Sequence, residues 1–398
     1  MIKNLSSRTL AISESLTVAI DTLAKQMIAD GKDVVSLGAG EPDFPTPSII
    51  CTEACKAINE GKTRYTSPVG ILELRKAVCD KLKNDNGLCY NPEQITMTSG
   101  AKHAVFNALA ALIDAGDEVI IPSPYWVTYP ELVKWLGGTP VFVETGIENE
   151  FKMTAYQLEN AISEKTKAVL LNNPCNPTGA VYTRDELEDL SRVIVKKGIY
   201  CISDEVYEYF VYDTEFHSIA SFDGMQERTI IVNGFSKSHS MTGLRIGYDA
   251  SPAPIAKLIG KIQGQATHHP SNISQYAALA ALKMGKSSID EMKKAFEHRR
   301  DFMLQNISHI LSKNLISPKG AFYLFPPIDH LFGKKTPDGK TITDSIELCK
   351  YILEEEGLAI VPGKAFGYDS CVRFSYAASD ENLKEACIRF KRAIDKLK

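Results

Sequence analysis

Short apolar runs alternate with helix-like segments along most of the chain, and this alternation is the feature that most restricts its fold. Glycine and proline punctuate the segments between the runs. Strands that alternate with helices form a mainly parallel sheet with helices on its faces. The pattern therefore predicts an α/β fold whose sheet has strands near seven positions: Ile95, Val119, Val141, Val169, Cys201, Ile230 and Gly247.

The last part of the chain has a different pattern. A charged amphipathic run at 293–300 is followed by strand signals at 321–324, 359–361 and 372–375. Helices and strands without regular alternation indicate a smaller α+β domain. A chain of 398 residues with 44% hydrophobic content is also long enough to divide into two domains.

Charge and cysteine content exclude several classes of function. The net charge is -4 and the sequence has no basic stripe, so we expect no binding to nucleic acid. The nine cysteines include no Cys-x-x-Cys pair, which is typical of free thiols in a reducing compartment and predicts no metal site. The sequence has no signal-peptide pattern and no apolar run of membrane-spanning length. We therefore expect a cytoplasmic protein that does not enter membranes.

One lysine lies among small and hydroxyl-bearing residues. Lys237 is flanked by Ser236 and Ser238, and Arg245 follows eight positions after the lysine. An unhindered amine can attack an aldehyde, and arginine can bind a phosphate through two parallel hydrogen bonds. The pattern indicates a lysine joined to an aldehyde cofactor that carries a phosphate. A Ser-Lys pair in isolation would instead be read as a solvated loop lysine.

An acid lies at the end of a predicted strand. Asp204 ends the apolar run 199–203, and ligands of open α/β sheets bind beyond the carboxyl ends of the strands. Asp204 is therefore a candidate ligand-binding residue. The alternative for Asp204 is a helix N-cap.

Three further segments point to anion binding. Gly100 and Ala101 begin a helix after a strand, and free backbone N–H groups at a helix start bind phosphate. The turn at 171–179 is rich in proline, which can hold the amide of Asn176 in a fixed direction. Arg373 lies in an alternating strand pattern, and its guanidinium could bind a substrate carboxylate. A turn asparagine and an edge-strand arginine facing water are the alternatives.

These segments together resemble the class I (fold type I) pyridoxal-phosphate-dependent aminotransferases, most closely the aspartate aminotransferase branch found in bacteria. The matches run in the family's order from Gly40 to Arg373. The resemblance implies pyridoxal 5'-phosphate as the cofactor and a homodimer with shared active sites. It also implies a large cofactor-binding domain at 46–290 and a discontinuous small domain made of 1–45 and 291–398.

The resemblance implies a role for each matching residue. Lys237 would attach the cofactor and act as general acid and base, Asp204 would contact the ring nitrogen, and Tyr207 the phenolic oxygen. The other cofactor-binding positions are Gly100, Ala101, Lys102, Trp126, Asn176, Ser236, Arg245 and, from a neighbouring subunit, Tyr65. The substrate-binding positions are Gly40, Lys102, Trp126, Asn176 and Arg373.

Substrate choice depends on residues that the shared motifs do not include. In one branch of the family an arginine binds the distal carboxylate of the substrate. The corresponding stretch here, 264–268, has no arginine. In the bacterial branch a lysine at the position of Lys102 faces that carboxylate, so we expect transfer between L-aspartate and 2-oxoglutarate. Some members also use prephenate and carry a basic residue near 13–17, whereas Ser13 and Glu14 stand here.

Three other functions stay open on the sequence. The first is an aromatic or broad-specificity aminotransferase, because Lys102 could bind phosphate alone. The second is a pyridoxal-phosphate-dependent β-lyase, which the same motifs would serve. The third is a non-enzymatic regulator, which the presence of Lys237, Asp204 and Arg373 disfavours.

Overall fold

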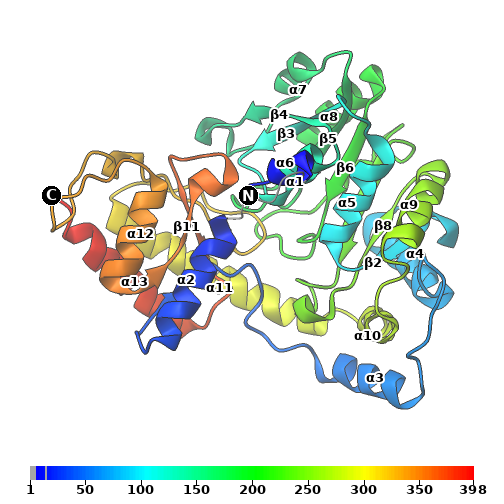
Figure 1. Ribbon diagram of the computed structural model, residues 1–398, viewed down its shortest axis with the longest axis horizontal. Coiled ribbons are helices and arrows are strands. Elements are labelled where there is room, and N and C mark those ends of the chain that lie inside the picture. The colour runs from blue at the N-terminus through cyan, green and yellow to red at the C-terminus, as the bar shows by residue number, and fades with distance from the viewer. Residues whose placement is uncertain (1–5, 14–15) are drawn as a thin grey trace.

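The structure is a computed structural model that describes residues 6–13 and 16–398. Its centre is a seven-stranded sheet with the strand order β2-β8-β7-β6-β5-β3-β4 (Figure 1). The predicted strands near all seven positions are confirmed. Their bounds are β2 Ile95–Thr98, β3 Glu118–Ser123, β4 Thr139–Glu144, β5 Thr166–Asn172, β6 Tyr200–Asp204, β7 Thr229–Gly234 and β8 Gly247–Ala250.

One strand of this sheet runs against the others. β8 is antiparallel to both of its neighbours, β2 and β7, whereas the remaining pairs are parallel. Gly234 at the end of β7 lies opposite Gly247 at the start of β8. The connection 235–246 therefore leaves and re-enters the sheet at the edge where β6 ends at Asp204. The reversal brings Lys237, Arg245 and Asp204 to one edge.

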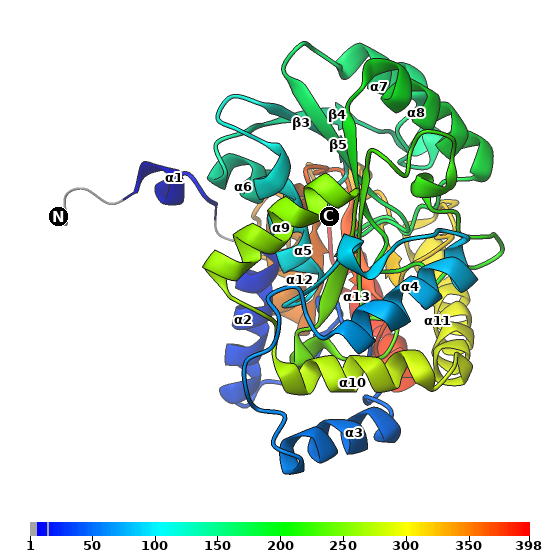
Figure 2. The ribbon, with the colours of Figure 1, turned by 90° about the vertical axis from the view of Figure 1, so that its right-hand side faces the viewer.

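Helices cover both faces of the sheet (Figures 1 and 2). On one face α5 packs on β7 and β8, α9 packs on α5, and α6 packs on β3 and β4. On the other face α4 packs on β2, and α10 lies against α3 and α4. The bounds are α3 Ser48–Asn59, α4 Leu72–Asn86, α5 Ala101–Leu112, α6 Thr128–Trp135, α7 Ala155–Ala161, α8 Arg184–Lys197, α9 Ala253–Ala266 and α10 Asn272–Lys283.

The two ends of the chain meet in a second region. β1 (Val35–Ser36) pairs in parallel with β10 (Leu358–Ala359), and β11 (Val361–Pro362), β12 (Val372–Ser375) and β9 (Tyr323–Leu324) form a three-stranded antiparallel sheet. The sequence predicted one strand over 359–361, but the structure divides that stretch between two sheets. The helices of the two ends are α1 Ser7–Leu10, α2 Leu16–Ala29, α11 Ser287–Leu311, α12 Ser345–Glu356 and α13 Asp380–Asp395.

Side chains from both ends share one buried apolar cluster. Val35 and Leu37 pack in it with Phe296, Leu348 and Phe390. The domain boundaries at 45 and 290 stay a prediction. No helix within the described residues, 6–13 and 16–398, has both the length and the apolar character needed to cross a membrane.

Candidate active site

A cavity of about 570 Å³ opens at the edge of the large sheet where β6 ends. Segments from both regions of the molecule line it, including the stretch after β1 and the strands β9 and β12. The structure brings nearly all the predicted site residues together there: Gly40, Ala101, Lys102, Trp126, Asn176, Asp204, Tyr207, Ser236, Lys237, Arg245 and Arg373. Gly100 adjoins the cavity through its contact with Arg245.

Lys237 lies where the two regions meet. Its Nζ donates a hydrogen bond to the carbonyl oxygen of Gly40. The pKa of the Lys237 amine is lowered to about 8, mainly by burial; the carboxylate of Glu41 opposes the shift and the guanidinium of Arg245 adds to it. A substantial part of this amine is therefore neutral near pH 8, which is the form that acts as a nucleophile or a base.

Asp204 is buried beneath the cavity with two donors on its carboxylate. Tyr129 Oη donates to Oδ2 at 2.7 Å, and the backbone N–H of Val206 donates to Oδ1 at 3.3 Å. Burial raises the pKa of the Asp204 carboxyl to about 6, and the hydrogen bond from Tyr129 limits the rise. The carboxylate form therefore predominates at neutral pH and can stabilise a cation in the cavity, such as a protonated ring nitrogen.

Aromatic side chains form part of the cavity wall. Tyr207 is buried, and its hydroxyl lies 2.8 Å from the hydroxyl of Tyr323. The ring of Trp126 packs edge-on against Tyr129, with centroids 5.2 Å apart. These side chains give the cavity wall aromatic faces and hydroxyl groups, which fits a planar ring that carries a polar substituent.

Gly100 and Arg245 form a compact cradle for an anion. A Cβ at Gly100 would lie 2.5 Å from Arg245 Nη2, so the close approach requires glycine, which also has φ +85°. In the described chain no side chain caps the start of α5, so the backbone N–H groups of its first turn can donate to an anion, although that of Gly100 donates to Thr98 O at 2.8 Å. Arg245 Nη1 donates to the carbonyl of Thr242 at 2.8 Å. The donors present fit a phosphate group.

Arg373 is a buried cation held by neutral groups. Its Nη1 donates to Asn176 Oδ1 at 2.9 Å and its Nη2 to the carbonyl of Gly38 at 2.7 Å. The guanidinium lies 4.5 Å from the ring centroid of Tyr323, and its Nε has no hydrogen-bond partner in the described structure. A buried cation without an acidic partner is costly, so this arginine fits a site that a carboxylate enters from outside.

Lys102 also lines the cavity and points over an aromatic ring. Its Nζ lies 5.0 Å from the ring centroid of Trp126. Burial lowers the pKa of the Lys102 amine, and the charge of Arg245 adds to this effect. Within the described residues, neither Lys102, Arg245 nor Arg373 forms an ion pair with an acidic side chain. The cavity thus carries unpaired positive charge at three points.

One predicted position, Tyr65, does not line the cavity. Tyr65 is 85% exposed and stacks on His268 with ring centroids 5.1 Å apart, so within one chain it does not reach the cavity. Glu14, which bears on prephenate use, lies outside the described residues. The sequence interpretation also omitted Tyr129 and Tyr323. The helical spacing of Tyr129 from Trp126 was a signal for the former, and the strand pattern at 321–324 was a signal for the latter.

Comparison with known proteins identifies relatives across the full length of the chain. The family described as aminotransferase class I and II matches residues 32–390. The aspartate aminotransferase of Bacillus subtilis is 45% identical over 98% of this chain and 99% of its own length. The aspartate/prephenate aminotransferase of Cereibacter sphaeroides is 44% identical over 97% of each chain. The crystal structure of the aspartate aminotransferase from Rhizobium meliloti superimposes with a TM-score of 0.96 at 41% identity, covering 99% of this chain and 100% of that one.

Proposed function

The chain belongs to the class I and II aminotransferases, and we propose that its reaction is amino transfer from L-aspartate to 2-oxoglutarate, which yields oxaloacetate and L-glutamate. The observation that carries this substrate choice is the unpaired positive charge of the cavity. Arg245 and the start of α5 would hold the cofactor phosphate, and Arg373 and Lys102 would then bind two carboxylates. A substrate with one carboxylate would leave Lys102, which lines the cavity, without an anionic partner.

The residues at the sheet edge would hold pyridoxal 5'-phosphate. Arg245, Ser236 and the backbone of Gly100 and Ala101 would hold its phosphate, Asp204 its ring nitrogen and Trp126 its ring face. Tyr207 and Asn176 would hold its phenolic oxygen. When bound, the cofactor supplies an aldehyde that takes up the substrate's amino group and a ring that withdraws electrons from the α carbon.

The protein's own residues would orient the substrate and move one proton. Arg373 would bind the α-carboxylate through two parallel hydrogen bonds, which fixes the direction of the α C–H bond. Lys237 Nζ would remove the α proton as its neutral amine and later deliver it, acting as base and then as acid. Its lowered pKa supports both roles near neutral pH.

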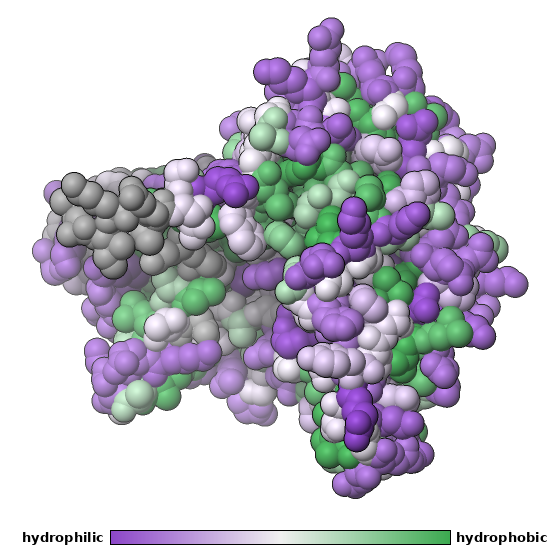
Figure 3. Space-filling view, turned by 45° about the vertical axis from the view of Figure 1, so that its right-hand side comes forward, coloured by the Kyte–Doolittle hydropathy of each residue, from purple (hydrophilic) through white to green (hydrophobic). Residues whose placement is uncertain are grey.

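We further propose that two copies of the chain share their active sites. Tyr65 is exposed and does not line the cavity of its own chain, as expected of a residue that serves a neighbouring site. α1 projects from the body (Figure 2) and carries Leu10, which is 70% exposed. Figure 3 shows apolar patches on one face of a largely hydrophilic surface, and such patches mark interaction sites. Sedimentation equilibrium of the purified protein tests the dimer, and a monomer would exclude it.

A single-turnover comparison tests the substrate. The holoenzyme is mixed separately with L-aspartate and L-tyrosine while the cofactor absorbance is followed. Much faster conversion by aspartate is the expected result, and equal or faster conversion by tyrosine would move the assignment to an aromatic or broad-specificity enzyme.

Lys102→Met provides the structural test of that preference. Loss of one charged contact should reduce the preference for aspartate over tyrosine about tenfold or more. Lys62→Met is the matched control, because Lys62 also lies over an aromatic ring, that of Tyr276 at 5.5 Å, but does not line the cavity. If Lys102→Met keeps the wild-type preference for aspartate over tyrosine, Lys102 contacts the cofactor phosphate and not the substrate.

A further inference from the structure

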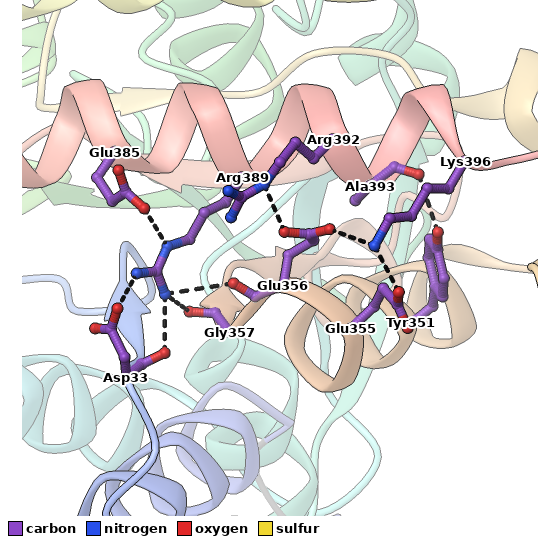
Figure 4. Close-up of polar contacts among 10 residues, drawn as sticks. All are labelled: Asp33, Tyr351, Glu355, Glu356, Gly357, Glu385, Arg389, Arg392, Ala393 and Lys396. Atoms are coloured by element: carbon purple, nitrogen blue, oxygen red, sulfur yellow. Dashed lines mark hydrogen bonds and ion pairs between the residues drawn. The ribbon is translucent and has the colours of Figure 1, made fainter.

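The guanidinium of Arg389 joins three stretches of chain that are distant in the sequence. Arg389 lies on α13 and is only 5% exposed (Figure 4). Its side chain extends to the segment before β1 and to the end of α12. A charged side chain is almost never buried this completely unless it has hydrogen-bond or ion-pair partners.

Arg389 uses all three of its nitrogens. Nε donates to Glu385 Oε1 at 2.8 Å, and Nη2 donates to the carboxylate of Asp33. Nη1 lies within hydrogen-bond distance of three main-chain carbonyl oxygens, those of Asp33 at 2.8 Å, Gly357 at 3.1 Å and Glu356 at 3.3 Å. The carbonyls at the end of α12 have no partner inside the helix, and a cation there is favourable.

The contact between the three stretches leaves no room for a side chain. Gly357 ends α12 in the left-handed conformation, with φ +64°. A Cβ there would lie 2.4 Å from the carbonyl oxygen of Asp33 and 3.0 Å from Arg389 Nη1. Arg389, Gly357 and Asp33 therefore form one close-packed joint.

This joint lies directly before the stretch that reaches the active site. Val35 N–H donates to Gly357 O and Leu37 N–H to Ala359 O, both at 2.8 Å, so β1 is fixed on β10 from its first residue. The carbonyl of Gly38 then accepts a hydrogen bond from Arg373, and that of Gly40 accepts one from Lys237. A shift of β1 would move both carbonyls.

We propose that Arg389 is a positioning residue for substrate binding. It fixes the start of β1 against the end of α12 and thereby places the Gly38 carbonyl that orients the Arg373 guanidinium. The proposed phosphate and ring-nitrogen contacts come from the edge of the large sheet and do not depend on this joint, whereas Lys237 contacts the stretch after β1 through the Gly40 carbonyl. Arg389 therefore controls affinity for the substrate carboxylate and leaves cofactor binding unchanged, which rests on the role proposed above for Arg373.

Arg392 offers a matched control on the same helix. Its side chain is 54% exposed, and its Nε donates to Glu356 at 2.8 Å (Figure 4). Like Arg389 it links α13 to α12, but the described structure gives it no contact with the segment before β1. Replacing it removes an arginine and an ion pair without releasing Asp33.

The experiment compares the holoenzymes of Arg389→Met, Arg389→Lys and Arg392→Met. For Arg389→Met we expect KM for both substrates to rise about tenfold with kcat changed less than about twofold, the signature of lost uniform binding. Cofactor absorbance per subunit should be unchanged, and amide hydrogen exchange over 33–41 should be faster. Arg389→Lys should have a KM between those of the wild type and Arg389→Met. Arg392→Met should change neither KM nor the rate of amide hydrogen exchange over 33–41.

Other outcomes overturn the proposal. They are an unchanged KM in Arg389→Met, or an equal rise in KM in Arg392→Met. Gly357→Ala tests the same joint if Arg389→Met fails to fold, and it should raise KM and speed exchange over 33–41 in the same way. An unchanged KM in that variant would also contradict the proposal. If the wild type does not convert aspartate, the proposed substrate is wrong, and the exchange measurement still tests the joint.

Discussion

The sheet edge and the stretch after β1 contribute to one cavity in different ways. At the sheet edge Asp204, Lys237 and Arg245 lie at or near strand ends, and each is placed by its own strand or by the connection beside it. On the opposite side Arg373 is held by the carbonyl of Gly38 and by Asn176, which are remote from it in sequence. The difference teaches that the cofactor side is built from local motifs, whereas the substrate side is assembled by tertiary contacts.

Lys237→Ala should have the largest effect, because Lys237 serves both sides. Loss of its amine removes the covalent attachment and the proton carrier, so turnover should fall by at least about ten-thousandfold. Steady-state transamination and a circular dichroism spectrum would measure activity and folding together. Retained turnover would remove Lys237 from the mechanism.

Arg373→Leu should weaken substrate binding and leave cofactor binding unchanged. Loss of two charge-assisted hydrogen bonds should raise KM for every amino acid and 2-oxo acid about a hundredfold. The cofactor absorbance should stay at wild-type intensity, because no cofactor contact is assigned to Arg373. Loss of cofactor from this variant would show that the two sides are not separable.

Tyr129→Phe should change the protonation of Asp204 on the cofactor side and leave substrate binding nearly unchanged. Without the hydrogen bond to Oδ2, the pKa of Asp204 should rise further above about 6. The carboxyl would then take up its proton at a higher pH as the pH falls. The acid limb of kcat should move up by about one pH unit with KM little changed. A pH profile that matches the wild type would exclude Tyr129 as the group that holds Asp204 ionised.

Asp249→Asn should leave both sides intact and change only stability. Asp249 lies in β8, and in the described structure neither of its carboxylate oxygens has a hydrogen-bond partner. Burial raises its pKa well above the ordinary value, so the folded state keeps its proton after the unfolded chain has lost it.

The wild type should therefore lose stability as the pH rises above about 4, by up to about 1.4 kcal/mol per pH unit, and the variant should lose less. Urea unfolding of both proteins at several pH values measures this. An equal pH dependence in the two proteins would mean that Asp249 has a partner when folded.

The sequence predicted the cofactor side better than the substrate side, for a physical reason. Strand periodicity and the motifs near Lys237 and Asp204 are local, and the seven strands appear where the apolar runs are. The division of 359–361 between two sheets depends on β1, a strand too short to show periodicity. The contacts of Arg373 with Gly38 and Tyr323 join residues that are far apart in the sequence, so no local sequence pattern predicts them.

The domain boundaries and the roles assigned to individual site residues stay predictions. Lys102 lies over Trp126, and the Lys102→Met variant decides between a phosphate and a distal carboxylate as its partner.

The reversed strand β8 has a consequence for protein engineering. Because β8 runs against β7, the connection 235–246 begins and ends at one edge of the sheet, and it carries both Lys237 and Arg245. The connection could therefore be exchanged between related scaffolds as one cassette. New chain ends made by circular permutation would be better tolerated in an exposed loop than in this largely buried connection.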